Sequence, residues 1–171
     1  MSDNDLLFFD MADKEMIEEK IGEALGLEKA AQKAVDELDS RGLLKPEHMK
    51  KLSKMKEEAS KQEQQMEELV QQLAESDGLD SEKIESTAEE TAEKVSKIME
   101  TYLGEDPDTQ EALEFLCLAE GGEVTHYEVL ASIAKDVENK KFGARVRAIL
   151  KEEQGHLELC TKLAKSNASA G

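Results

Sequence analysis

The feature that most constrains the fold is a series of long segments with helical periodicity, separated by very few breakers. Glycine and proline interrupt the chain at 42–46, at Gly78 and at 104–107, and the polar run 138–141 makes one further break. Between these points apolar residues recur at helical spacing, and no run of alternating β-branched residues indicates a strand. The sequence therefore predicts an all-α protein, with helices over about 12–40, 46–75, 81–103, 107–137 and 142–164.

These helices fit one domain, because 171 residues suffice for a single core. The helix at 81–103 has few apolar positions, so we expect it to pack on the outside of a four-helix bundle as a crossover between two hairpins. Asp106 is expected to cap the following helix, with Pro107 in its first turn. The predicted parts are an N-terminal extension (1–11), a first hairpin (12–75), the crossover (76–105), a second hairpin (106–165) and a frayed tail (166–171).

Charge and cysteine content exclude several classes of function. The chain has 22 Lys and Arg against 40 Asp and Glu, a formal charge of −18, which repels nucleic acids and anionic membrane surfaces. Cys117 and Cys160 are too far apart for a CxxC motif and fit a reducing compartment. The N-terminus lacks the pattern of a signal peptide, and no segment approaches the roughly 18 apolar residues of a membrane span. We therefore expect a soluble cytoplasmic protein.

A glutamate interrupts the apolar stripe of each of the four long helices: Glu28, Glu63, Glu120 and Glu153. In each hairpin the two glutamates are nearly equidistant from the turn, so each pair can lie at one depth. An unpaired buried carboxylate costs several kcal/mol, and like-charged neighbours add to the cost. The remedies are protonation, basic partners or a bound metal, and the stripes carry almost no Lys or Arg. A multivalent cation is the simplest of these remedies.

Further potential ligands lie one helical turn from these glutamates. Glu123 follows Glu120 by three residues, and His156 follows Glu153 by three, which places an oxygen and an imidazole on one helix face. His126 follows Glu123 by three and is either a ligand or an edge histidine. Carboxylate and imidazole together suit iron or manganese, and sometimes zinc.

The sequence resembles the ferritin-like di-iron carboxylate superfamily, with rubrerythrin-type and bacterial ferritin-like stress proteins as the nearest relatives. The resemblance covers about 24–165 and is specific over 113–165; it depends on the motifs EGGEVTHY (120–127), KEEQGH (151–156) and GLEKAAQK (26–33). It implies an antiparallel four-helix bundle with metal ligands at Glu28, Glu120, Glu123, Glu153 and His156. Met66 departs from the family, which usually has a histidine there, and a thioether is a poor ligand for a hard, oxygen-rich site.

The resemblance also implies a function. The expected cofactor is two metal ions, iron before manganese or zinc, with Glu120 or Glu153 bridging them and His156 terminal. A di-iron oxidase or peroxidase would react with O2 or peroxide in oxidative stress or iron handling, and would need a separate electron-donor protein. Tyr127 is either a core residue or a hydrogen-bonding partner of the chemistry. A homodimer is the expected assembly.

Two other functions stay open at the level of sequence. Met66 and the interrupted second stripe would also fit a metal-free helical bundle that dimerises or binds a partner helix. A single-ion protein that uses only the second hairpin is the third reading.

Overall fold

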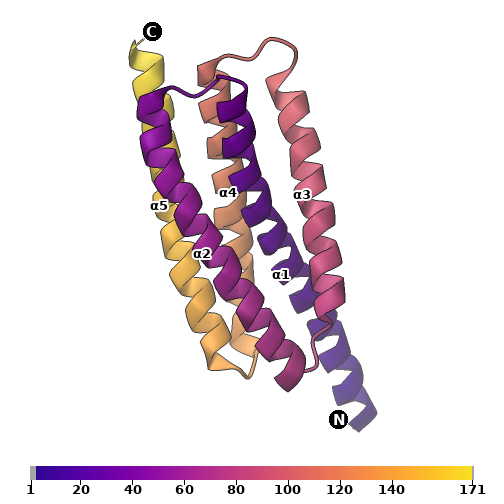
Figure 1. The fold of residues 1–171 in the computed structure, drawn as a ribbon. Coiled ribbons are helices and arrows are strands. Elements are labelled where there is room, and N and C mark those ends of the chain that lie inside the picture. The colour runs from indigo at the N-terminus through magenta and orange to yellow at the C-terminus, as the bar shows by residue number, and fades with distance from the viewer. Residues whose placement is uncertain (1–2, 171) are drawn as a thin grey trace.

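The computed structural model describes the backbone of residues 3–170 and the side chains of residues 13–170, and in this part of the chain it is entirely helical (Figure 1). Five α-helices and one 3₁₀ turn follow one another as α1 (Asp3–Ser40), α2 (Pro46–Ser76), α3 (Ser81–Leu103), α4 (Thr109–Ile133), η1 (Ala134–Asp136) and α5 (Lys140–Ala170). The all-α prediction is confirmed, and no strand occurs within residues 3–170.

Successive helices run in opposite directions, so α1 and α5 rise where α2 and α4 descend (Figure 1). Helix α1 packs against α2 and α4, while α5 packs against α4 and α2, which closes a bundle of four helices. Helix α3 lies along α1, on the side away from α5 (Figure 1). It buries only Ile84, Ala88, Met99 and Leu103, as expected for a helix packed outside the bundle.

Two glycines of α1 allow α3 to approach closely. A Cβ at Gly22 would lie 2.6 Å from Thr87 Cβ, and one at Gly26 would lie 2.5 Å from the carbonyl oxygen of Ala88. The start of α3 is also fixed, because the buried Glu18 carboxylate of α1 accepts a hydrogen bond from the backbone N–H of Asp80. Helix α3 is therefore an integral part of the fold.

Several helix ends differ from the predicted ones. Asp108, and not Asp106, caps α4, because its carboxylate accepts the N–H of Glu111 at 2.8 Å. Helix α1 includes most of the predicted extension 1–11, although Met1 and Ser2 lie outside the described residues. The predicted frayed tail is helical to Ala170, since Asn167 bonds both Lys45 and Gln110.

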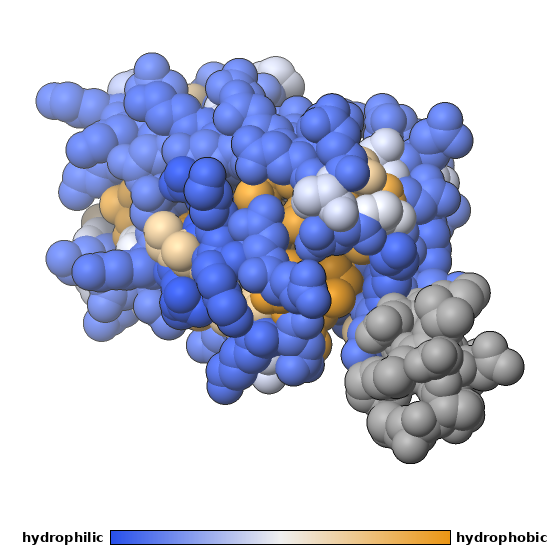
Figure 2. Space-filling model, turned by 90° about the horizontal axis from the view of Figure 1, so that it is seen from below, coloured by the Kyte–Doolittle hydropathy of each residue, from blue (hydrophilic) through white to orange (hydrophobic). Residues whose placement is uncertain are grey.

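The apolar core has two parts, one toward each end of the bundle. One part contains Ile21, Leu73, Leu130 and Val146, and the other contains Leu38, Leu52, Leu113 and Leu163, among others. Seen from below, hydrophilic residues cover most of this face and hydrophobic residues are visible in the gaps among them (Figure 2). Between the two parts of the core, the helices carry buried polar side chains.

None of the helices that the structure describes is both long and apolar enough to cross a lipid bilayer.

Candidate metal centre

Three helices bring four carboxyl groups into this interior layer. Glu28 comes from α1, Glu120 and Glu123 from α4, and Glu153 from α5, and all four residues are at most 2% exposed. His156 of α5 joins them and is 5% exposed. Each helix places its glutamate here because the residue lies in the stripe that faces the core, between apolar residues one or two turns away. The structure thus brings together five of the residues that the sequence singled out.

The carboxyl and imidazole groups form two sets that share one residue. In each set one ligand atom per residue lies within 4.8 Å of the others, a spacing that could hold a metal ion. The first set, called the histidine position below, is Glu120, Glu153 and His156. The second, called the oxygen position, is Glu28, Glu123 and Glu153. Glu153 therefore lies between two adjacent candidate metal positions.

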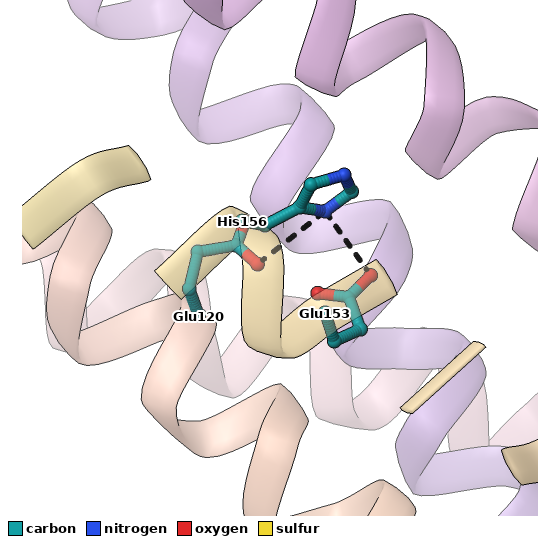
Figure 3. A group of neighbouring side chains, drawn as sticks. All are labelled: Glu120, Glu153 and His156. Carbon is teal, nitrogen blue, oxygen red and sulfur yellow. Dashed lines mark ion pairs between the residues drawn. The ribbon is translucent and has the colours of Figure 1, made fainter. Parts of the chain in front are cut away.

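The histidine position is defined by the Nδ1 atom of His156. This nitrogen lies 3.5 Å from Oε1 of Glu153 and 4.0 Å from Oε2 of Glu120 (Figure 3). The other ring nitrogen, Nε2, lies 2.8 Å from Oε2 of Glu58 on α2. A carboxylate that accepts the Nε2 proton leaves Nδ1 free as a ligand and fixes the orientation of the ring.

Most polar atoms of this layer have no hydrogen-bond partner among the described residues. They include both oxygens of Glu28, Glu123 and Glu153, one oxygen of Glu120, and Nδ1 of His156. Buried polar atoms are normally paired, so each such atom requires an explanation. A cation bound among them would supply the missing partner for all of these atoms at once.

Electrostatics shows how the layer behaves without a cation. Burial raises the pKa of Glu28, Glu120 and Glu123 well above the ordinary value, and neighbouring carboxyl groups add to the effect. Burial also acts on Glu153 and His156, but their contact outweighs it: the pKa of Glu153 falls to about 2 and that of His156 rises to about 9. Without a metal ion the cluster therefore holds one buried ion pair, Glu153 with His156, beside three carboxyl groups whose protonated form is favoured by burial.

Ionisation of all four carboxyl groups without a cation would cost a large part of the stability of the fold. Two like charges 4 Å apart repel by about 4 kcal/mol at an effective dielectric constant near 20, and a protein of this size is stable by only about 5–15 kcal/mol. Two divalent cations carry four positive charges, which balance four carboxylates. The residues present therefore fit two divalent ions in both number of donors and charge, with oxygen donors and one imidazole, a set suited to iron, manganese or zinc.

The prediction that Glu63 points into this layer is wrong. Glu63 is half-buried at the edge between α1 and α2, where Gln32 Nε2 donates to its Oε2 at 3.4 Å, and burial raises its pKa. The neighbouring residue Gln62 is the buried one, at 1% exposure, and its Oε1 has no partner among the described residues. Met66 is also fully buried, so the inward face of α2 offers an amide and a thioether at this level.

His126 lies apart from the two positions, at the outer edge of α4. Its Nε2 is 3.2 Å from Oε2 of Glu23, its Nδ1 is 2.8 Å from the carbonyl oxygen of Gly122, and its side chain is 35% exposed. Of the two interpretations that the sequence left open, the structure places His126 as an edge histidine.

Tyr127 is fully buried on α4, one helical turn after Glu123. Its hydroxyl has no hydrogen-bond partner among the described residues, and burial together with the charges of Glu28 and Glu123 raises its pKa. The hydroxyl therefore stays protonated and is available as a donor to the oxygen position.

Sequence reasoning missed Glu58 and Gln62. Glu58 is partly exposed and lies outside the apolar stripe of α2, so its pairing with His156 has no signal in the sequence. The signal for Gln62 was ambiguous, because residues 62 and 63 follow Ala59 by three and four positions and both fit its helix face.

The fold and the site together define an all-helical bundle with a buried cluster of carboxyl groups and one imidazole. Comparison of the chain with protein-family models, curated proteins and solved structures gave no significant match. A functional assignment must therefore depend on the geometry of the cluster.

Proposed function

We propose that this protein binds two metal ions, iron in the first place, between α1, α4 and α5, and that it is a ferritin-like di-metal carboxylate protein. The observation that carries the proposal is the shared position of Glu153, which belongs to both buried sets of potential ligands. Glu153 would bridge the two ions, Glu120 and His156 would complete one position, and Glu28 and Glu123 the other.

The arrangement of the helices supports the finer fold assignment. Helices α1 and α2 form one hairpin, α4 and α5 form another, and α3 returns from one end of the bundle to the other between them (Figure 1). This is the connectivity expected for a ferritin-like bundle with a helical crossover.

The function would be redox chemistry with O2 or peroxide in the cytoplasm, in oxidative-stress or iron handling. Two adjacent ferrous ions supply two electrons to such an oxidant when bound. The chain's own residues hold the ions, exclude bulk water through the apolar core on both sides, and keep a proton on Tyr127 next to the site. A separate electron-donor protein and a homodimeric assembly belong to this proposal.

The test is anaerobic reconstitution with ferrous iron, followed by elemental analysis and an optical spectrum before and after addition of O2 or peroxide. The proposal expects about two iron equivalents per chain and a spectral change on oxidation. Glu153→Ala should abolish most binding, because it removes a ligand from both positions. Glu158→Ala, an exposed change on the same helix, is the matched control and should bind as the unmodified chain does.

The second candidate is a metal-free helical module that binds a partner or dimerises. Gln62 and Met66 favour it, because α2 lacks a buried carboxylate at the level of the cluster. Under this reading no iron is retained, and Glu153→Ala leaves no change in metal content.

A further inference from the structure

The two positions share Glu153, but their remaining donors differ in kind. The histidine position adds one carboxylate and the Nδ1 of His156, whereas the oxygen position adds two carboxylates, Glu28 and Glu123. The difference is therefore one nitrogen donor against one oxygen donor.

No imidazole can complete the oxygen position. The chain has three histidines. His156 belongs to the histidine position, and His126 is turned toward Glu23. His48 lies at the start of α2, where its Nδ1 accepts the backbone N–H of Lys45 at 3.3 Å. The buried residues of α2 at this level, Gln62 and Met66, offer an amide and a thioether but no imidazole.

The histidine position is also the one whose ligand is held by a residue outside the two sets. Glu58 holds Nε2 of His156 at 2.8 Å, whereas neither oxygen of Glu28 or Glu123 has a hydrogen-bond partner among the described residues. A carboxylate behind a ligating histidine fixes its tautomer and raises its basicity, which strengthens binding of metals that favour nitrogen. Carboxylate oxygens alone instead suit hard ions such as Mg²⁺, Ca²⁺ and Mn²⁺.

The geometry points to a centre with two unequal metal positions: the histidine position selects a nitrogen-preferring ion such as Fe²⁺ or Zn²⁺, and the oxygen position accepts a hard ion such as Mn²⁺ or Mg²⁺. This inference rests on the proposed function, since it requires that both positions bind a metal. It adds that the bound pair is mixed when both kinds of ion are present.

Competition between Mn²⁺ and Mg²⁺ tests the inequality without any measurement of activity. The chain is loaded with Mn²⁺, and Mg²⁺ is then added while the electron paramagnetic resonance signal of aqueous Mn²⁺ reports its release. Mg²⁺ should displace one of the two Mn²⁺ ions at a concentration roughly tenfold or more below that needed for the other, because Mg²⁺ competes poorly at a nitrogen ligand.

Two isosteric variants, three residues apart on α4, assign the positions. Glu123→Gln weakens the oxygen position and should leave one Mn²⁺ that resists Mg²⁺. Glu120→Gln weakens the histidine position and should leave one Mn²⁺ that Mg²⁺ displaces readily. Circular dichroism of both variants checks that the helical fold is kept. If a variant does not fold, the competition experiment on the unmodified chain still tests whether the two positions are unequal.

The outcomes separate the inference from the proposed function. Release of both Mn²⁺ ions over one range of Mg²⁺ concentration, or a reversed order in the two variants, overturns the inequality while leaving a two-metal centre. Failure of the unmodified chain to bind Mn²⁺ at all overturns the two-metal centre, and the inequality with it.

Discussion

The stability of the metal-free protein should decrease as the pH rises, and Glu123→Gln should reduce this dependence. Burial raises the pKa of Glu123 in the folded chain, so its carboxyl group stays protonated where the unfolded chain, near the ordinary value of 4.5, is ionised. The folded state then binds more protons than the unfolded state. Stability contributed by this group is fully present below about pH 4.5 and is lost as the pH rises toward the folded pKa.

The magnitude follows from proton linkage. One extra proton in the folded state lowers the free energy of unfolding by about 1.4 kcal/mol for each pH unit. Glu28 and Glu120 have pKa values raised in the same direction, so between the ordinary carboxyl value and the folded pKa values the three carboxyl groups together can give a slope of about 4 kcal/mol per pH unit; above about pH 6.5 His156, with its pKa raised to about 9, adds to it. A glutamine at 123 cannot ionise, and this variant should lose about 1.4 kcal/mol per pH unit of that slope.

Urea unfolding in the presence of a chelator, at several pH values from 5 to 8, measures this slope. Glu128→Gln is the control, because it makes the same change in formal charge on an exposed site of the same helix and so reports the general self-repulsion of an acidic chain. The reasoning is refuted if the two variants have equal slopes, or if Glu123→Gln is the less stable of the two at pH 8.

Three further predictions follow from the same geometry. Binding of a divalent ion should release protons and strengthen as the pH rises toward 9, where His156 loses its proton; calorimetry in two buffers of different ionisation enthalpy measures the release. Glu58→Gln should weaken metal binding by about 10- to 100-fold, because it removes the support of the His156 ring, and a smaller effect in metal titrations would argue against that role. Gly26→Ala should destabilise the fold by about 1–3 kcal/mol, since its Cβ would lie 2.5 Å from the Ala88 carbonyl oxygen. Gly121→Ala, which has open space at its Cβ, is the control and should stabilise the fold by up to about 1 kcal/mol. Thermal melts of the two variants measure both effects, and equal effects at the two glycines would contradict the close packing of α3.

Helix number and order could be predicted from the sequence because the breakers are few and strong. Pro46 occupies the first turn of α2, and Gly104, with φ of 67°, ends α3 where a left-handed residue is required. The exact residues at which helices begin and end were less predictable, because they depend on contacts between residues that are distant in the sequence. Asn167 shows this, since its bonds to Lys45 and Gln110 extend α5 beyond the expected end.

The convergence of Glu28, Glu120, Glu123, Glu153 and His156 could also be predicted, because each lies in a continuous apolar stripe. The same reasoning failed on α2, where residues 62 and 63 follow Ala59 by three and four positions and are almost equally placed on a helix face. Only packing against α5 decides between them. Glu58 could not be found at all, because its pairing with His156 depends on the spacing of two helices.

The central claim is that metal ions bind where the buried acids meet. A crystal structure of the metal-loaded protein, with anomalous scattering recorded at the absorption edge of the added metal, tests it most directly. We expect two anomalous peaks, one on either side of the Glu153 carboxylate. Peaks confined to the surface, or an interior without anomalous density in crystals grown with excess metal, would contradict the account.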